Sequence, residues 1–340
     1  MNRQLTLARR PEGLVGADDF ALVERPRPTL EEGEALMRTV YLSIDPTVRT
    51  WISEARSYFP PVALGEVVRC SGTGVIVETR CDAYSVGDRV YGLTGWQDYA
   101  VVRDDVFTST LAPDADLLPA LGVFGNNGLT AYIGMVDVGG LDLDGTSAGA
   151  TVVVSAAAGA TGSIAGQIAH LLGCRVVGIA GRDDKCAWVV DELGFDACVN
   201  HRAPDFAGQL RAATPDRVDV YFDNVGGPVL DTVLKRLAPH GRVVLCGAIA
   251  VYNAAHKPPG PANYLELITQ RGTMVGFNAF DHWDRFAEIA TRLATWTQEG
   301  RLVHREHVID GLERAPEALN MLFTGDNLGK LVVQVSDPPT

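Results

Sequence analysis

A glycine-rich turn follows a strongly apolar, β-branched run in the stretch SAAAGATGSIAGQIAHLLGC (155–174). Aligned with the pattern G-x-G-x-x-G, its three key positions are Ala157, Gly159 and Gly162. The second position must be small so that the backbone can approach a pyrophosphate, and the third lets a helix pack close to the strand. The N-terminus of that helix then faces the phosphates. The stretch predicts a dinucleotide site; the alternative is a packing turn without a ligand.

The end of the next expected strand indicates which dinucleotide binds. An NAD site places an acidic residue there, which bonds the ribose 2′-hydroxyl, whereas this chain has Gly181 followed by Arg182 and Lys185. Two cations and no carboxylate favour the 2′-phosphate of NADP(H). In the alternative interpretation both cations are solvated, and Asp183 and Asp184 complement the dipole of the following helix.

Residues that could bind a metal are scattered along the chain. Zinc sites need Cys, His and carboxylate ligands that converge, but the first 169 residues contain no histidine and no C-x-x-C pair occurs. The pair His304 and His307 lacks a third ligand and is typical of an exposed surface. We therefore predict no metal site.

The order of the expected elements predicts an α/β protein. Residues 1 to about 110 contain β-branched, partly alternating runs that Gly, Pro and Asp interrupt, as in β-strands. Further along, six strands alternate with amphipathic helical stretches, and strands that are apolar throughout are usually buried in a parallel sheet. We expect these strands at 151–156, 175–180, 197–200, 219–225, 242–248 and 273–279. They predict a doubly wound sheet with its ligand at the carboxyl ends of the strands.

A strand–helix–strand pattern returns after a last helix at about 284–299. Because an isolated pair of strands is not stable by itself, we expect this tail to rejoin the first domain. The predicted domains are 1–125, completed by 308–340, and 126–307.

Composition and charge exclude several classes of protein. The chain has 340 residues, 46% hydrophobic, and a formal net charge of −13 without a basic run, which argues against nucleic-acid and anionic-membrane partners. Residues 145–174 carry no Asp, Glu, Lys or Arg, but TVVVS followed by helical spacing indicates a strand, a turn and a helix rather than a membrane span. Six scattered cysteines and the lack of a signal peptide predict a cytoplasmic location.

Several short motifs carry a resemblance to a known family. They are YLSIDPTVR (41–49), SYFPPVALGEVV (57–68), GLTAY (128–132), SAAAGATGS (155–163), GRDDK (181–185), YFDNVGG (221–227), CGAIAVYN (246–253) and GDNLGK (325–330). With them the chain resembles the medium-chain dehydrogenase/reductase superfamily, in its zinc-independent branch of prostaglandin reductases, alkenal double-bond reductases and curcumin-reductase-like enzymes. The resemblance implies a GroES-like β-rich first domain and a Rossmann second domain that binds NADP(H).

The same resemblance implies which residues contact the cofactor. For the pyrophosphate these are Gly159, Ala160, Thr161 and Gly162, and for the 2′-phosphate Lys185 and His201, next to Arg182, which the residues themselves suggest. Toward the nicotinamide they are Cys246, Gly247, Ala248, Ile249, Tyr252, Phe277, Asn278 and Ala279. Asn224, at the end of the fourth strand, and Asn327, in the returning tail, are further contacts with the cofactor.

Some positions depart from the pattern of many relatives. Thr47 and His201 stand where tyrosine is frequent, and Asn126 and Asn127 stand where Met-Pro is frequent. Because these positions belong to the substrate and cofactor motifs, the substrate of a relative cannot be transferred to this chain.

The reaction implied is the NADPH-dependent reduction of the carbon–carbon double bond of an enone or enal. Hydride adds to the β-carbon, and the negative charge that builds on the carbonyl oxygen needs a hydrogen-bond donor. The candidates for a phenol donor are Tyr252 and Tyr58, and a ribose hydroxyl of the cofactor is the alternative. A quinone reductase on the same scaffold, or an NADP-binding protein with little turnover, remains open. Relatives are commonly homodimers, so a homodimer is expected.

Overall fold

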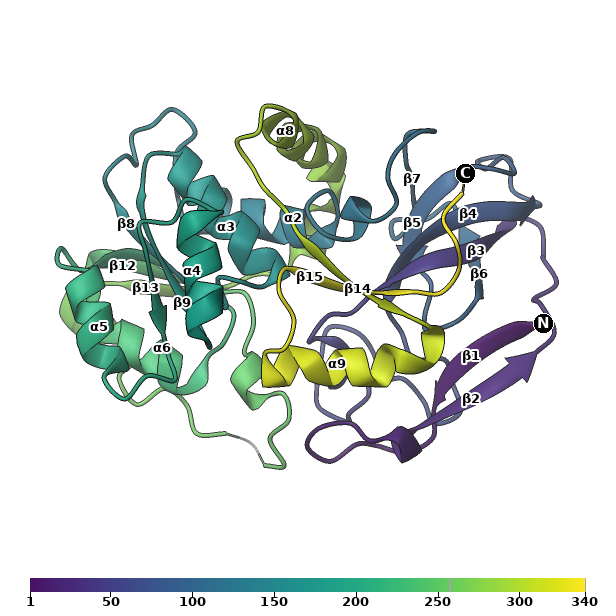
Figure 1. Cartoon of the computed structure of the whole chain (residues 1–340), viewed down its shortest axis with the longest axis horizontal. Coiled ribbons are helices and arrows are strands. Elements are labelled where there is room, and N and C mark those ends of the chain that lie inside the picture. Colours follow the sequence, from purple (N-terminus) through teal and green to yellow (C-terminus); the bar gives the residue numbers. More distant parts are fainter. Residues whose placement is uncertain (257, 340) are drawn as a thin grey trace. The chain divides into compact units, whose positions relative to one another are not determined.

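A computed structural model describes residues 1–256 and 258–339 (Figure 1). The chain divides into two compact units. Unit 1 comprises residues 1–121 and 306–340, and unit 2 comprises residues 122–305. Unit 1 is therefore built from both ends of the chain. Unit 2 is continuous in sequence.

Unit 1 is organised around a mostly antiparallel sheet. Its strand order is β14-β15-β3-β4-β5-β7, and β6 pairs with β3. The strands are β3 (Glu34–Ser43), β4 (Ser71–Thr79), β5 (Arg89–Leu93), β6 (Tyr99–Arg103), β7 (Ser109–Thr110), β14 (Glu306–Asp310) and β15 (Lys330–Gln334). A separate antiparallel pair consists of β1 (Asn2–Leu7) and β2 (Phe20–Arg25). The helices are α1 (Val48–Trp51) and α9 (Ala315–Thr324).

Strands β3 and β4 approach each other closely at a glycine. A Cβ atom at Gly74 would lie 2.1 Å from the carbonyl oxygen of Arg38, across the sheet. No side chain fits at that distance, so glycine permits the pairing of these two long strands. The core that they help to enclose includes Ala35, Met37 and Ile76.

The C-terminal tail is held in unit 1 by packing and by polar contacts. Figure 1 shows α9, in yellow, beside β1 and β2, and its Ala318 and Leu319 share a core cluster with Leu5 and Leu7. Strand β15 pairs antiparallel with β3. The ammonium group of Lys330, at the start of β15, lies 2.7 Å from a carboxylate oxygen of Asp45 and donates to the carbonyl oxygen of Ile44.

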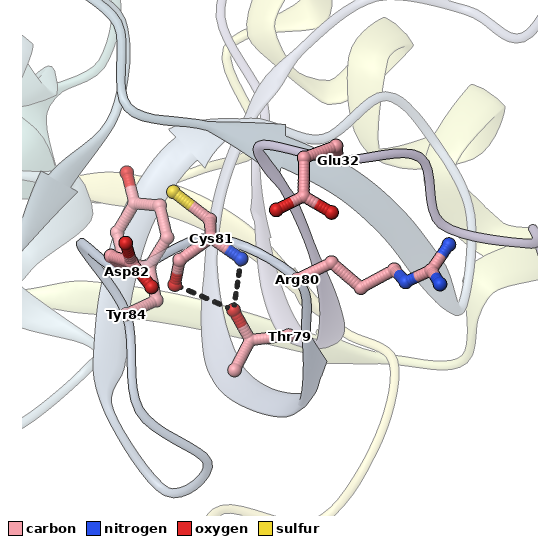
Figure 2. A pocket seen from close by; sticks show the side chains of 6 residues that line it. All are labelled: Glu32, Thr79, Arg80, Cys81, Asp82 and Tyr84. Carbon is pink, nitrogen blue, oxygen red and sulfur yellow. Dashed lines mark hydrogen bonds between the residues drawn. The ribbon is translucent and has the colours of Figure 1, made fainter.

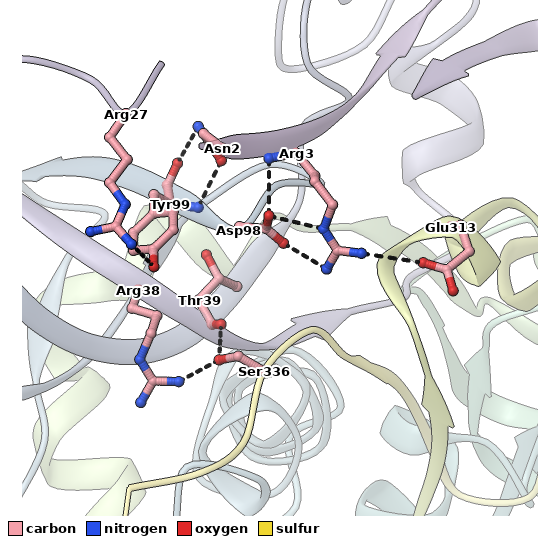
Figure 3. A network of polar contacts seen from close by, with 9 residues as sticks. All are labelled: Asn2, Arg3, Arg27, Arg38, Thr39, Asp98, Tyr99, Glu313 and Ser336. Atoms are coloured by element: carbon pink, nitrogen blue, oxygen red, sulfur yellow. Dashed lines mark hydrogen bonds and ion pairs between the residues drawn. The ribbon is translucent and has the colours of Figure 1, made fainter. Parts of the chain in front are cut away.

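A second polar network fixes the chain ends of unit 1 (Figure 3). Arg38 of β3 donates to the hydroxyl of Ser336, which donates to the carbonyl oxygen of Thr39 at 2.7 Å. At the other end of the network, Arg3 of β1 lies 3.0 Å from Asp98 and 3.8 Å from Glu313. The network therefore ties both termini to the central strands.

Unit 2 is a doubly wound parallel sheet with the strand order β10-β9-β8-β11-β12-β13. All five neighbouring pairs are parallel. The strands are β8 (Thr151–Ser155), β9 (Arg175–Ala180), β10 (Ala197–Asn200), β11 (Val218–Asp223), β12 (Leu237–Leu245) and β13 (Thr273–Gly276). The helices are α2 (Asn126–Tyr132), α3 (Ala160–Leu171), α4 (Asp183–Asp191), α5 (Phe206–Ala213), α6 (Gly227–Leu234), α7 (Glu266–Gln270) and α8 (Phe286–Gln298). This architecture confirms the predicted fold class.

The strand order places a topological switch point between β8 and β11. The chain proceeds from β8 outward to β9 and β10, and then returns to β11 on the other side of β8. In doubly wound sheets the ligand binds at such a point, outside the carboxyl ends of the strands. The glycine turn after β8 and the motif after β11 therefore lie at the position where a dinucleotide is expected.

The uncharged stretch 145–174 forms β8 and α3, as predicted. All residues of β8 are buried. Within residues 1–256 and 258–339, no helix is long and apolar enough to cross a membrane.

We predict that Lys330→Met destabilises the protein by about 3 kcal/mol, because removal of one partner leaves a charge in a largely buried site. Lys330 is 3% exposed in its pair with Asp45. Urea unfolding measures the change. Arg314→Ala removes an exposed pair with Glu317 and serves as the control, with little expected change. Equal losses in the two variants would contradict the prediction.

Candidate functional site

The glycine turn after β8 has the backbone geometry that a dinucleotide loop needs. Strand β8 ends at Ser155, and the next residue, Ala156, has a φ of 50°. A Cβ atom at Gly162 would lie 2.3 Å from the carbonyl oxygen of Ala156. The third motif position must therefore be glycine for α3 to start so close to the strand. The first turn of α3 contains no acidic residue, so its N-terminus suits an anion.

The carboxyl ends of β8 and β11 are joined by side-chain hydrogen bonds. The amide of Asn224 donates to the carbonyl oxygen of Ser155 at 2.7 Å, and the Ser155 hydroxyl accepts from the Asn224 N–H at 2.9 Å. The same hydroxyl donates to the fully buried carboxylate of Asp223 at 3.1 Å. Asn224, a predicted site residue, is therefore fixed at the switch point.

Basic side chains surround the end of β9. A Cβ atom at Gly181 would lie 3.1 Å from Nε2 of His201 and 3.4 Å from Nε of Arg202. Burial, and then the charge of Arg202, lower the pKa of His201. Lys185, in the first turn of α4, is only 8% exposed. The structure thus brings Gly181, Lys185, His201 and Arg202 to one edge of the sheet.

Arg182 lies at this edge but already has a partner within the chain. Its guanidinium donates two hydrogen bonds to the carboxylate of Asp184, at 2.9 and 2.7 Å. Both side chains are substantially exposed. Of the two cations that the sequence predicts for a phosphate, Arg182 is thus paired with Asp184, whereas Lys185 is largely buried.

The segment after β12 brings a phenol close to the switch point. The N–H groups of Cys246 and Gly247 donate to the carbonyl oxygen of Asp223, at 2.9 and 3.0 Å. The N–H of Ala248 donates to the phenol oxygen of Tyr252 at 3.1 Å. Burial raises the pKa of Tyr252, and the hydrogen bond from Ala248 lowers it by less. The phenol is therefore neutral at pH 7 and retains a proton to donate.

Two other predicted positions in unit 2 have clear local roles. Burial raises the pKa of the Cys246 thiol to about 12, so this thiol is no nucleophile. Asn278, just after β13, accepts a hydrogen bond from the N–H of Phe280 at 3.1 Å and caps the following helical turn, Ala279–Arg285.

Two predicted site residues belong to unit 1. The phenol oxygen of Tyr58 lies 2.8 Å from the hydroxyl of Thr47, and its ring meets Trp51 edge to face. Tyr58 is 54% exposed. Asn327 is buried in the turn before β15, where its amide donates to the carbonyl oxygen of Gly329 at 3.1 Å.

Comparison with known proteins identifies the family. Residues 3–109 match the family described as "N-terminal domain of oxidoreductase", and residues 160–296 match the family described as "Zinc-binding dehydrogenase". The NADPH-dependent curcumin reductase of Escherichia coli is 40% identical, with 98% of this chain and 97% of that protein covered. Prostaglandin reductase 1 of Rattus norvegicus is 37% identical, with coverages of 97% and 98%. The chain belongs to the medium-chain dehydrogenase/reductase family.

A solved structure agrees with this assignment. The crystal structure of CurA from Vibrio vulnificus in complex with NADPH has a TM-score of 0.93 to this chain and 42% sequence identity, with coverages of 99% and 100%. The predicted resemblance to the branch of curcumin and prostaglandin reductases is confirmed.

The residues of this family member fit NADP(H) at the carboxyl edge of the unit 2 sheet. The absence of room for a side chain at Gly162 lets α3 start close to β8, and Gly159, at the second motif position, has no side chain that would keep a pyrophosphate from the backbone. At the end of β9, Gly181 stands where an NAD enzyme has a carboxylate, His201 and Arg202 lie beside it, and Lys185 lies in the first turn of the following helix α4. The position of the acidic residue of an NAD site is thus taken by a glycine with basic side chains next to it.

Two hydrogen bonds at the candidate site were not predicted from the sequence. Asp223 was part of the quoted motif YFDNVGG, but its role in joining strand ends was not predicted. The amide of Asn127, in α2, donates to the hydroxyl of Thr161 in the glycine loop at 3.1 Å. The only sequence signal for the second contact was the departure from Met-Pro at residues 126–127.

A hollow of about 440 Å³ in unit 1 is a separate feature (Figure 2). It is lined by Glu32, Thr79, Arg80, Cys81, Asp82 and Tyr84. The hydroxyl of Thr79 donates to the carbonyl oxygen of Cys81 and accepts from its N–H, both at 3.0 Å. These contacts shape the turn after β4, and none of the predicted site residues lies there.

We predict that the purified protein contains well under one zinc per chain and that chelators leave its activity intact. Within residues 1–256 and 258–339, no group of three or more His, Cys, Asp or Glu side chains is placed to hold a metal ion. Elemental analysis and an assay with a chelator measure the two quantities. Stoichiometric zinc on which the activity depends would overturn the prediction.

Proposed function

We propose that this protein reduces the carbon–carbon double bond of α,β-unsaturated ketones or aldehydes with NADPH. Its family makes it an NADP-dependent oxidoreductase, and relatives named as curcumin and prostaglandin reductases support a reductase. The observation that carries the finer proposal is the neutral phenol of Tyr252, which Ala248 holds at the carboxyl end of β12.

The residues at the sheet edge divide the binding of NADP(H) among them. The loop of Gly159, Ala160, Thr161 and Gly162 holds the pyrophosphate, and Lys185, His201 and Arg182 hold the 2′-phosphate. Asn224, the segment from Cys246 to Ile249 and the segment from Phe277 to Ala279 line the nicotinamide half. Asn327 of unit 1 is a further predicted contact. When bound, the nicotinamide supplies a hydride.

The chemistry of enone reduction matches a site with a neutral donor. As hydride reaches the β-carbon, charge moves to the carbonyl oxygen, and a preorganised donor stabilises it. Tyr252 accepts a hydrogen bond from Ala248 and so directs its own proton away from that N–H. That proton is then available to the substrate oxygen. Tyr58 is the second candidate donor, and a ribose hydroxyl of the cofactor is the third.

Substrate profiling tests the proposal directly. NADPH consumption is measured with enals, enones, curcumin-like dienones and quinones, and each product is identified. Saturated ketones or aldehydes as products support the proposal. Turnover of quinones alone supports the quinone reductase alternative, and tight NADPH binding without turnover supports a binding protein.

We further propose a homodimer in the cytoplasm. Strand β13 lies at one edge of the unit 2 sheet, and exposed apolar side chains lie on it or on the preceding segment: Tyr264, Leu265, Ile268 and Val275. An exposed sheet edge with such side chains favours pairing with another chain. Light scattering should give twice the chain mass of 36.4 kDa; the mass of a single chain would exclude the dimer.

Six free thiols support a reducing compartment, and fractionation of the source cells should recover the protein with the cytosolic fraction.

We predict that Tyr252→Phe lowers kcat on a good enone by at least about tenfold, because the transition state loses one hydrogen-bond donor. Tyr58→Phe is the matched comparison, since it removes the other candidate phenol. Steady-state kinetics with saturating NADPH measure both variants. If both retain the wild-type kcat, a ribose hydroxyl or water is the donor.

We predict that wild-type protein prefers NADPH to NADH by roughly a hundredfold or more in kcat/KM, since two charge-assisted bonds to a phosphate are each worth about 1.5–3 kcal/mol. Removing both cations (Arg182→Ala with Lys185→Ala) should raise the KM for NADPH strongly and leave that for NADH nearly unchanged. Arg211→Ala, on the exposed side of α5, is the control. Equal kcat/KM for both cofactors in the wild type would contradict the prediction.

A further inference from the structure

Helix α2 contacts the glycine loop through one buried side chain. Asn127, the second residue of α2, is 8% exposed, and its amide nitrogen donates to the hydroxyl oxygen of Thr161 at 3.1 Å. Thr161 lies in the first turn of α3, within the loop of Gly159 to Gly162. The contact therefore joins the start of one helix to the start of another, at the edge where the pyrophosphate is proposed to bind.

The backbone that carries Asn127 is tightly held. A Cβ atom at the next residue, Gly128, would lie 1.9 Å from the carbonyl oxygen of Val123. The N–H of Gly128 donates to the carbonyl oxygen of Gly122, and that of Leu129 donates to Gly125. Because the α2 start is packed against the preceding loop in this way, Asn127 presents its amide from a fixed point.

The amide nitrogen of Asn127 is the group that makes this contact possible. A side chain without an N–H donor could not form the hydrogen bond to the Thr161 hydroxyl.

We propose that Asn127 is a positioning residue that sets the direction of the Thr161 hydroxyl for the pyrophosphate of NADP(H). An amide N–H occupies an acceptor position on Thr161 Oγ1, so the hydroxyl proton points elsewhere and is free to donate. Phosphate oxygens only accept, and they bind at helix N-termini such as that of α3. The hydroxyl and the backbone N–H groups of α3 then donate to the same anion. The inference rests on the proposed pyrophosphate site.

The substitution Asn127→Asp tests the direction of this hydrogen bond at nearly constant volume. A carboxylate has no N–H, so Thr161 must donate to it, and the hydroxyl proton is withdrawn from the cofactor. The added negative charge opposes the pyrophosphate as well. We expect the dissociation constant of NADPH, measured by calorimetry, to rise at least about tenfold, in line with the loss of one charge-assisted bond.

Asn127→Ala and Thr161→Val separate positioning from charge and keep the test usable if the aspartate variant fails to fold. Each should weaken NADPH binding by several-fold. In the double variant Asn127→Ala/Thr161→Val, the alanine substitution should add no further loss, because its effect acts through the hydroxyl that valine lacks. Additive losses would overturn the proposal.

Adenosine 2′-monophosphate provides the control ligand, because it carries the 2′-phosphate and lacks the pyrophosphate. Its affinity should be the same in the wild type, Asn127→Ala and Asn127→Asp, whereas a general loss of structure would weaken it too. Unchanged NADPH affinity in all variants would overturn the role of Asn127 alone. Failure of the wild type to bind either ligand would instead overturn the proposed nucleotide site.

Discussion

The buried carboxylate of Asp223 joins the two central strands of the unit 2 sheet at the point where they diverge. One of its oxygens accepts hydrogen bonds from the hydroxyls of Ser155 and Tyr221 and from the N–H groups of Val225 and Gly226, at 2.7–3.1 Å. A buried charge is costly unless hydrogen bonds compensate it. Here four hydrogen bonds to Oδ1 fix the end of β8, the end of β11 and the turn that follows β11, while Oδ2 is buried without a hydrogen-bond partner among the described residues.

Most of the proposed nucleotide site depends on this junction. Ser155 precedes the glycine loop, Asn224 follows the carboxylate, and the carbonyl oxygen of Asp223 accepts the N–H groups of Cys246 and Gly247. The first residues of the segment that carries Tyr252 are therefore hydrogen-bonded to the same residue, Asp223. We propose that cofactor selection is a local property at the end of the neighbouring strand β9. The formal net charge of −13 opposes an anion, but salt screens distant charges beyond roughly 8–10 Å. Direct contacts of Lys185, His201 and Arg202 with a 2′-phosphate would lie within that distance.

The sequence predicted the architecture because the relevant signals are local. Apolar strands between amphipathic helices indicate a parallel sheet, and all six predicted strands of unit 2 are present. The positions at which these strands end were predicted less accurately. Strand β11 was expected to extend to residue 225 but ends at Asp223, because the N–H groups of Val225 and Gly226 turn back to its carboxylate. Likewise, β8 ends at Ser155 because Ala156 adopts a left-handed conformation.

Contacts between residues far apart in the chain could not be predicted from the sequence. Ser155 and Asp223 are 68 positions apart, Asn127 and Thr161 are 34 apart, and Lys330 and Asp45 are 285 apart. Each pair lies in motifs or departures that the sequence had singled out, yet nothing in a single sequence states which members meet. The hydrogen bond between Tyr252 and Ala248 joins residues only four positions apart. It could not be predicted either, because it depends on the irregular turn after β12 rather than on a periodic pattern.

The position of the transferred hydrogen tests the central claim most directly. NADPH deuterated at the transferred position is incubated with an enone, and the product is examined by NMR. The account predicts deuterium on the former β-carbon of a saturated ketone, with the carbonyl group intact. Deuterium on the carbonyl carbon of an allylic alcohol would contradict it.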